Sequence, residues 1–484
     1  MGFTVIIVGG SVSGLSLANI LETFGIDYVL LEGHDTIAPQ LGASIGLLPT
    51  GLRILDQLGC YERIRELAGK VDYKACMRLF SGRYWFDKTP VSFSERLEDR
   101  IGYPQIFIDR QSLLQVLFDK LKHKERVLTK KRVTSVEMDD HQVTVRTQDG
   151  SMYAGDIVVG ADGVHSKVRE EMWRNALEAK SGIFEQGQVN GLQSDSNCIF
   201  GISKRPPGLP DTAIQINAFF TNCYYMILSA PGDRVYWFLF VQASRSRGVD
   251  IPRFTKDDER RLAERHFGDQ ITEKTTFEDI YTRKLHTSLV AIEDHVFPRW
   301  HFRKILTIGD AAHKVHPTSA QGGNSAMETA AVLVNVLRQK MAQGHPGAPL
   351  SEKDIEDVFE GVQEKQFDRV SAAVDQGRRT NSISIKDTLL SRIFVDHFFA
   401  RFGQSLIFRL IIANAESGPI IEGLPVPPRH AKALACHREK SRKGGWVTWG
   451  FRPLGVGFMA ILVYYSTLRW MLPYLSQRMG LQVW

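Results

Sequence analysis

Residues 4–15 read TVIIVGGSVSGL, and this stretch decides the fold. The apolar run that ends at Val8 is typical of a buried strand, the two glycines after it make a tight turn, and the apolar side chains up to Phe24 recur at helical spacing. A second apolar strand over residues 28–31 ends in Glu32. The sequence therefore predicts a strand–helix–strand unit whose turn directs backbone N–H groups and a helix N-terminus to one point, where they can bind a pyrophosphate.

Glu32 and Ser11 bear on what this turn binds. A carboxylate at the end of the second strand accepts hydrogen bonds from both hydroxyls of an adenosine ribose and disfavours a 2′-phosphate. Ser11, however, stands where the usual fingerprint has its middle glycine, and its Cβ changes how closely the backbone approaches a phosphate. A tight turn with only a structural role is the alternative. The strand before it, the helix after it and the position of Glu32 favour a dinucleotide site.

Length and composition bound the class of protein. The 484 residues are too many for one ordinary domain and suggest two or three. Hydrophobic residues make up 43% and charged residues 24%, which excludes a disordered or collagen-like chain, and the formal net charge of +6 is too small for a nucleic-acid binder. The five cysteines are scattered without a CxxC pair, so we expect no disulfide framework, no zinc site and a reducing compartment. No basic region precedes the first apolar run, so we do not expect a signal peptide.

Two further strands are predicted to end in carboxylates. The apolar run over residues 156–161 is followed by Asp162 and a glycine, and the run over 304–308 is followed by a glycine and Asp310. A carboxylate at the C-terminal end of a strand can accept hydrogen bonds from ribose or ribityl hydroxyls. Both positions are therefore candidates for the same nucleotide site.

A helix start and a cation complete the candidate site. The helix expected over residues 325–337 follows Gly-Gly-Asn at 322–324, and its N–H groups and dipole would stabilise negative charge on a reduced ring system. Arg110, which follows the apolar segment 107–109, offers a permanent cation to the pyrophosphate or to an anion beside the ring.

Together these motifs resemble the group A flavin monooxygenases, typified by para-hydroxybenzoate and salicylate hydroxylases, over residues 3–340. The resemblance implies an α/β fold, in which a Rossmann-like FAD-binding domain has an inserted antiparallel-sheet substrate domain and is followed by a hydrophobic helical C-terminus. It also implies FAD as cofactor and NAD(P)H as reductant, without a separate nicotinamide domain. By position, the implied FAD contacts are Glu32, Gly46, Arg110, Asp310 and Gly323, with Gly9 and Gly14 in the phosphate turn.

The expected domain order follows from the same resemblance. It comprises the first part of the FAD-binding domain (1–172), a mainly antiparallel substrate domain (173–284), the second part of the FAD-binding domain (285–375), a helical region (376–445) and a transmembrane segment (446–472).

The sequence is also similar to fungal FAD-dependent monooxygenases of the paxilline type, which epoxidise prenyl chains in indole-diterpene and meroterpenoid biosynthesis before a terpene cyclase acts. This similarity rests on the Gly-Gly-Ser-x-x-Gly-Leu pattern at 9–15, on LRILDQLG at 52–59 and on the hydrophobic tail. It implies that a flavin C4a-hydroperoxide epoxidises an alkene of a prenylated lipophilic intermediate in fungal terpenoid secondary metabolism. Such a reaction requires no general base, so no catalytic residue is assigned.

Two other functions stay open at this point. One is an aromatic-ring hydroxylase of the same fold, whose product would have a phenolic oxygen. The other is a non-redox flavin-fold escort of prenylated proteins, which Ser11 and the lipophilic tail would fit. Asp310, Arg110 and the glycine-rich helix start argue against the escort, because they serve a bound flavin.

Aromatic residues gather in the middle of the chain, where strands are expected over 213–220, 224–229 and 235–241 with a turn at 231–233. An aromatic sheet of this kind suits a lipophilic substrate, although aromatic side chains also fill ordinary sheet cores. The sequence does not separate the rings that would face a pocket from those that would not, Tyr224 from Tyr225 included.

His313 and His316 have a spacing that can ligate a metal on a helix. Pro317 follows them and no pair of carboxylates is near, so we expect them to pack in a loop or lie beside the flavin. No metal site is predicted.

The C-terminal part predicts membrane attachment. A basic cluster at 437–443 precedes a run without charged residues, 454–468, and tryptophans lie on both sides of that run. We expect the segment 446–472 to anchor the protein in the endoplasmic reticulum membrane with the body facing the cytoplasm. A buried amphipathic helix is the alternative, because the run is shorter than the roughly 20 residues of a span. A second apolar stretch, 393–412, contains two arginines and favours a helix that lies on a surface or packs on the body over one that spans the membrane.

Overall fold

The structure is a computed structural model that describes residues 2–429 except 40–43, 70–71, 89–90, 185–190, 211, 345–348 and 386–387. The predicted transmembrane segment 446–472 lies outside the described residues. Within them, no helix is both long enough and apolar enough to cross a bilayer.

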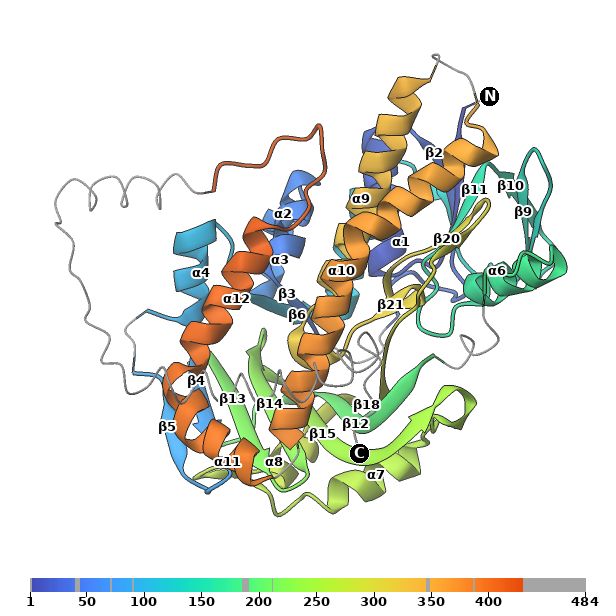
Figure 1. Ribbon diagram of the computed structural model, residues 1–484. Helices are drawn as coiled ribbons and strands as arrows, with labels where there is room; N and C mark the ends of the chain where they lie inside the picture. Colours follow the sequence, from blue (N-terminus) through green and yellow to red (C-terminus); the bar gives the residue numbers. More distant parts are fainter. Residues whose placement is uncertain are drawn as a thin grey trace, which may run out of the picture. The chain divides into compact units, whose positions relative to one another are not determined.

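A six-stranded sheet contains the predicted strand–helix–strand unit (Figure 1). Strand β1 pairs in parallel with β2 on one side and with β11 on the other, and β11 pairs in parallel with β20. Segments that are far apart in the sequence therefore end at the same edge of one sheet. In spatial order the strands are β19 (His301–Phe302), β20 (Ile305–Thr307), β11 (Ile157–Gly160), β1 (Thr4–Val8), β2 (Asp27–Leu31) and β7 (Val127–Leu128).

Apolar side chains on both faces of β1 explain why both faces of this sheet are covered. Ile7 packs in a core with helices α1 (Val12–Thr23) and α9 (Gly322–Gln343). Ile6 packs on the opposite face, in a second core with α6 (Lys167–Glu178) and the small antiparallel sheet. That small sheet consists of β8 (Val133–Met138), β9 (Val143–Thr147) and β10 (Met152–Gly155). Burial on both faces is typical of a parallel sheet in an α/β protein.

The predicted antiparallel strands belong to an eight-stranded sheet, and the turn at 231–233 is confirmed. Four of its strands lie outside the expected range or extend beyond it: β4 and β5 lie before residue 90, with β4 paired in parallel to β13, and β18 and β21 follow residue 283. This sheet therefore extends beyond the expected substrate-domain range of 173–284. In spatial order its strands are β21 (His313–Lys314), β18 (Lys284–Val296), β12 (Gln193–Lys204), β15 (Arg234–Arg247), β14 (Cys223–Ala230), β13 (Ile214–Phe220), β4 (Lys74–Arg78) and β5 (Tyr84–Phe86).

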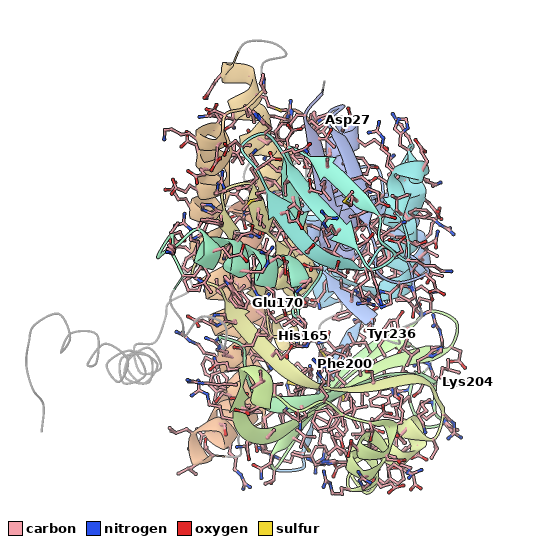
Figure 2. The ribbon with its side chains drawn as sticks, turned by 90° about the vertical axis from the view of Figure 1, so that its right-hand side faces the viewer. Asp27, His165, Glu170, Phe200, Lys204 and Tyr236 are labelled. Carbon is pink, nitrogen blue, oxygen red and sulfur yellow. The ribbon has the colours of Figure 1, made fainter. Side chains whose placement is uncertain are left out.

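The two faces of the eight-stranded sheet have different partners. One face packs on α7 (Lys256–Glu264) and α8 (Phe277–Tyr281) around the fully buried Trp237. The other face shares a core with the six-stranded sheet and its helices. Figure 2 shows Phe200 and Tyr236 of this face, with His165 of the loop after β11, in the layer between the two sheets. The predicted α/β class is therefore confirmed.

The remaining elements connect or cover these sheets. Strands β3 and β6 form a two-stranded pair beside the first sheet, and α10 packs along α9. The predicted helical region is helical as far as Glu416, and the described chain is irregular after it. The bounds are β3 (Ser44–Leu47), β6 (Ile106–Asp109), α2 (Pro49–Gln57), α3 (Tyr61–Ala68), α4 (Phe93–Ile101), α5 (Arg110–Lys120), α10 (Glu352–Ile385), α11 (Leu389–Ile393), the π-helix η6 (Phe394–Gly403) and α12 (Gln404–Glu416).

Candidate functional site

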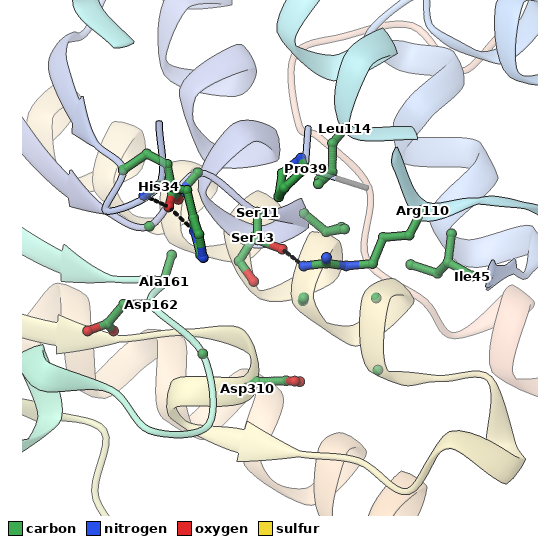
Figure 3. Close-up of a pocket in the computed structure, with 18 of the residues that line it drawn as sticks. Ser11, Ser13, His34, Pro39, Ile45, Arg110, Leu114, Ala161, Asp162 and Asp310 are labelled. Atoms are coloured by element: carbon green, nitrogen blue, oxygen red, sulfur yellow. Dashed lines mark hydrogen bonds and ion pairs between the residues drawn. The ribbon is translucent and has the colours of Figure 1, made fainter. Parts of the chain in front are cut away.

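A cavity of about 520 Å³ lies at the carboxyl ends of the parallel strands, between the two large sheets (Figure 3). Open α/β sheets bind ligands at this edge. Of the seven predicted site residues, six line the cavity: Gly9, Glu32, Gly46, Arg110, Asp310 and Gly323. Gly14 does not line it and lies instead in the first turn of α1, against the backbone of the glycine turn.

The turn between β1 and α1 requires glycine at two positions. Gly9 has φ +105°, and a Cβ there would lie 2.4 Å from the carbonyl oxygen of Ala161. A Cβ on Gly14 would lie 1.9 Å from the carbonyl oxygen of Gly9. These contacts hold the helix start close to the strand end, so the N–H groups of the first turn of α1 lie at the cavity.

Ser11 has a specific contact that accounts for its departure from the glycine pattern. Its hydroxyl accepts a hydrogen bond of 2.7 Å from the guanidinium of Arg110, drawn as a dashed line in Figure 3. A glycine could not accept this bond. Ser11 therefore positions the predicted cation beside the phosphate turn.

Arg110 is a half-buried cation at the cavity wall. Burial lowers the pKa of its guanidinium, while the nearby carboxylates of Asp310 and Glu32 act in the opposite direction. Among the described residues, no carboxylate forms an ion pair with Arg110. A half-buried cation at a cavity wall can form charge-assisted hydrogen bonds, so the surroundings of Arg110 fit an anionic ligand such as a pyrophosphate.

Glu32 is held at the cavity edge by the backbone. Its Oε2 accepts a hydrogen bond of 2.6 Å from the N–H of Gly10, and its Oε1 accepts one of 2.8 Å from the N–H of His34. The imidazole Nδ1 of His34 lies 2.7 Å from the same Oε1. These contacts fix the carboxylate orientation next to the first turn of α1, where a ribose hydroxyl can reach it.

The two predicted strand-end carboxylates differ in their surroundings. Asp310 lies at the cavity and forms an ion pair with Lys314. Asp162 also lines the cavity, but its oxygens accept hydrogen bonds from the Ser166 hydroxyl (2.5 Å) and the Val168 N–H (3.1 Å) at the start of α6. Burial raises the pKa of Asp162. Its carboxylate therefore also stabilises the turn into α6, and its predicted contact with a ribose or ribityl hydroxyl stays a prediction.

Asn324 ties the start of α9 to strand β3, a role the sequence analysis missed. Its Oδ1 accepts a hydrogen bond of 3.0 Å from the N–H of Leu48, and its Nδ2 donates to the carbonyl of Gly46 at 3.0 Å. A Cβ on Gly46 would approach Ala320 to 3.0 Å. The predicted residues Gly46 and Gly323 are therefore brought together across the cavity by a buried side chain. The Gly-Gly-Asn pattern predicted the helix start but not the hydrogen bonds of Asn324 to β3.

Apolar side chains of the eight-stranded sheet form part of the cavity wall. Phe200, Phe238 and Met226 lie in one row across three neighbouring strands and line the cavity. Their row continues to Asn217, whose Oδ1 accepts a hydrogen bond of 2.7 Å from the hydroxyl of Tyr224. We call Phe200, Met226 and Phe238 the apolar wall.

The structure separates the aromatic residues that the sequence could not. Tyr224 and Tyr236 belong to the core shared with the six-stranded sheet, whereas Tyr225 and Trp237 belong to the core under α7 and α8. The alternation follows from the two-residue period of a strand. Burial raises the pKa of Tyr224, so its hydroxyl is protonated at neutral pH.

His313 and His316 are buried and pack separately. His313 Nε2 lies 2.9 Å from the hydroxyl of Thr329, and the ring of His316 stacks on Phe240 at 6.0 Å between centroids. Burial lowers the pKa of His313 to about 4 and that of His316 to about 3, so both are neutral at pH 7.

One group with metal-ligand side chains lies elsewhere in the described part of the chain. Cys223, His266 and Asp269 gather on the sheet face that packs under α7 and α8. His266 Nδ1 lies 2.9 Å from Asp269 Oδ2, and the hydroxyl of Tyr225 donates to the same oxygen at 2.6 Å. These contacts make an internal hydrogen-bond network, and the predicted absence of a metal site stays a prediction.

Comparisons with known proteins agree with this geometry. Residues 2–348 match the FAD binding domain family. The chain is 36% identical over 456 residues to the FAD-dependent monooxygenase olcE of Penicillium canescens, which covers 93% of this chain and 96% of the relative. It is 35% identical over 434 residues to the FAD-dependent monooxygenase aurC of Calcarisporium arbuscula, with 89% and 87% covered.

Among solved structures, Klebsiella pneumoniae HpxO complexed with FAD and uric acid has a similar fold. The TM-score is 0.68 at 23% sequence identity, over 86% of this chain and 97% of that chain.

Proposed function

Because this chain belongs to the FAD binding domain family and is an FAD-dependent monooxygenase, we propose that it epoxidises an alkene of a prenylated, lipophilic intermediate. FAD, when bound and reduced, supplies the activation of O₂. One oxygen atom enters the alkene, the other leaves as water, and NAD(P)H supplies the two electrons. The monooxygenase relatives remove the non-redox escort as an alternative.

The cavity supports a specific placement of FAD. The pyrophosphate would lie at the N-terminus of α1 beside Arg110, and Glu32 would accept hydrogen bonds from the adenosine ribose. Asp310 would bind ribityl hydroxyls. The ring system would lie by Gly46 and Gly323, where the N-terminus of α9 stabilises negative charge. This placement directs the ring toward the apolar wall.

The observation that carries the substrate proposal is the apolar wall itself. None of the side chains of Phe200, Met226 and Phe238 can remove a proton. Hydroxylation of a phenol gains from a base that deprotonates the ring, whereas an alkene reacts without one. The wall can instead exclude water and hold an apolar chain by its rings, which is what epoxidation requires of the protein.

Incubation with farnesyl- or geranylgeranyl-bearing aromatic compounds under ¹⁸O₂ tests this function. The expected product gains one labelled oxygen and opens to a diol in acid, as an epoxide does. A labelled phenol would instead establish the aromatic-ring hydroxylase. Product that forms without label would overturn the proposal.

A matched pair of variants tests the wall. Phe238→Glu should lower kcat/KM at least about tenfold, because a carboxylate in an apolar wall must be desolvated for the substrate to bind. Phe238→Leu should retain most activity, and both variants should keep their FAD, since Phe238 belongs to the eight-stranded sheet and is not among the predicted FAD contacts. Equal kcat/KM for the Glu variant and the parent would contradict a role of this wall in substrate binding.

We also propose that the enzyme acts at the endoplasmic reticulum membrane, with its body facing the cytoplasm. The basic cluster 437–443 ahead of the uncharged run 454–468 supports this orientation. An epoxide is also the kind of product that an acid-initiated terpene cyclase opens, so coupling to such a cyclase in fungal terpenoid or meroterpenoid secondary metabolism is part of the proposal.

A further inference from the structure

A row of apolar side chains runs along the last described helices, exposed at both ends and half-buried at Phe394 and Phe398 in its middle. Its members recur every four residues through α11, η6 and α12, and we call this row the apolar stripe. Leu390 is 66% exposed, Phe402 54% and Leu410 44%. The members are Leu390, Phe394, Phe398, Phe402, Leu406 and Leu410. Exposed apolar patches of this extent are uncommon on soluble monomers and mark interaction surfaces.

The π-helix keeps this stripe on one side. In an α-helix, positions four residues apart drift slowly around the axis in one direction. In the wider turns of η6 (Phe394–Gly403), four residues make slightly less than one full turn, so successive stripe members shift around the axis in the opposite direction. The shift in η6 therefore offsets the shift in α11 and α12. Within η6 the rings of Phe394 and Phe398 lie 5.3 Å apart, and those of Phe398 and Phe402 lie 5.2 Å apart. The aromatic part of the stripe is therefore continuous.

The opposite side of this segment is fixed to the body of the protein. The carboxylate of Asp396 accepts hydrogen bonds from the N–H groups of Phe80 (2.9 Å) and Ser81 (3.0 Å). Val395 is buried, and the ring of Phe408 packs edge-on against Phe93 of α4. Figure 1 shows α11 and α12 alongside α4, β4 and β5. Phe394 also packs against the main core, so the body holds the segment in place and leaves Leu390, Phe402, Leu406 and Leu410 exposed.

The charges beside the stripe indicate what covers it. Arg401 and Arg409 lie exposed on the same segment, while the carboxylate of Asp396 is engaged by the backbone. An amphipathic helix with apolar and aromatic residues on one face and arginines beside them binds at a lipid interface, and arginines favour anionic headgroups. We propose that the apolar stripe docks the enzyme body on the surface of an anionic lipid bilayer.

A chain of aromatic contacts links this surface to the cavity. Phe80, whose N–H binds Asp396 of η6, packs on Phe219 at 5.6 Å between ring centroids. Phe219 packs on Tyr224 at 5.2 Å, Tyr224 on Phe240 at 5.8 Å, and Phe240 on Phe238 of the apolar wall at 6.2 Å. Docking would therefore bring the bilayer to the side of the body that connects with the wall. Docking itself does not depend on the proposed function. The delivery of a lipophilic substrate from the bilayer to the cavity does rest on it.

Site-specific fluorescence of the full-length chain tests the docking. The described cysteines are buried, so in a Cys436→Ser background Leu406→Cys offers one exposed thiol for an environment-sensitive label. Vesicles of phosphatidylcholine with phosphatidylserine should shift its emission to the blue, and a nitroxide-bearing lipid should quench it. The matched control is Leu177→Cys on α6, another exposed leucine on a helix, which should respond to neither.

Three outcomes would overturn the docking. Equal responses of the two labels, or none at Leu406, would show that the stripe does not enter the bilayer. A blue-shifted label without vesicles, in a species of doubled mass, would identify a second copy as the occupant. The same shift in a monomer, lost when residues 430–484 are removed, would identify the chain's own C-terminal part.

A charge variant adds a direct check. Arg401→Glu with Arg409→Glu should weaken the response to anionic vesicles without changing the FAD content, and an unchanged response would contradict the role of the arginines. Because the label reports docking without turnover, failure of the epoxidation leaves this result unaffected. Oxygen insertion measured in detergent likewise tests the function apart from docking.

Discussion

Arg110 supplies a positive charge at the candidate cofactor site. Its guanidinium is half-buried, donates to Ser11 and has no ion-pair carboxylate among the described residues. Arg110→Gln should therefore weaken FAD binding about tenfold or more, since a hydrogen bond to a charged group contributes roughly 1.5–3 kcal/mol. Titration of apoprotein with FAD, followed by flavin fluorescence, measures the effect. Arg174→Gln on α6, outside the cavity lining, is the control, and an unchanged Kd for Arg110→Gln would contradict the placement.

His316 makes stability depend on pH. Burial lowers its pKa to about 3, against about 6.5 in an unfolded chain, so the unfolded state binds a proton that the folded state does not. Stability should therefore fall as the pH drops below about 6.5, by at most about 1.4 kcal/mol per pH unit for this histidine. Urea unfolding at pH 7, 6 and 5 measures the slope. His316→Gln should make the slope smaller without abolishing it, because burial lowers the pKa of His313 as well, whereas the exposed His286→Gln should leave the slope unchanged. An equal slope in both variants would be inconsistent with a buried neutral His316.

At the scale of elements, the packing of α1 on β1 depends on one missing side chain. Gly14→Ala would place its Cβ 1.9 Å from the Gly9 carbonyl oxygen, so helix and strand must separate and the phosphate turn must open. We expect a lower melting temperature and loss of FAD. Gly361→Ala in α10 is the matched control, since its Cβ would meet Val336 at an ordinary 3.4 Å and helix propensity favours alanine by up to about 1 kcal/mol. Equal melting of the two variants would contradict the close packing.

Elements set by local pattern were predictable from the sequence, and their pairing was not. The strands predicted over 4–8 and 28–31 are observed as Thr4–Val8 and Asp27–Leu31, because buried apolar runs bounded by turns specify strands locally. The antiparallel pairing of β3 with β6 joins segments about 60 residues apart, and the parallel pairing of β4 with β13 joins segments about 140 residues apart. Both pairings depend on tertiary packing.

The same distinction applies to the site. Six predicted residues share one cavity because the carboxyl ends of parallel strands meet at one sheet edge. The bond from Arg110 to Ser11 and the tie from Asn324 to Gly46 join positions about 100 and 280 residues apart, and no spacing rule reveals them. Whether these residues hold FAD stays a prediction that the Arg110 variants test.

At the scale of the whole molecule, the segment Gly418–Arg429 fastens the last helices to the nucleotide-binding part, and we call it the strap. Ile421 is fully buried, and its backbone N–H and carbonyl both bond to the side chain of Gln57. Asn335 of α9 donates to the carbonyl of Ile420 at 2.8 Å. Arg429 forms a bidentate ion pair with Asp56 of α2.

Two truncations test the strap. A chain that stops after Arg429 keeps every strap contact and should melt close to the full-length protein while retaining FAD. A chain that stops after Glu416 loses the burial of Ile421, worth about 1.5–3 kcal/mol, and the bonds to Gln57 and Asn335, so it should melt several degrees lower. Differential scanning calorimetry measures both. If the shorter chain melts like the longer one, the strap does not stabilise the body.

The interleaving of the two large sheets constrains how the chain is synthesised. β4 and β5, before residue 90, can join their sheet only after its other strands, between residues 193 and 314, have been translated. In the other sheet, β11 can pair with β20 only after Ile305–Thr307 has been translated. Neither sheet can close until about two thirds of the polypeptide has left the ribosome. Throughout that interval the nascent chain has open strand edges, which are prone to aggregate and are typical targets of chaperones. A product of premature termination near residue 300 would therefore be cleared as misfolded protein rather than persist as a stable half-enzyme.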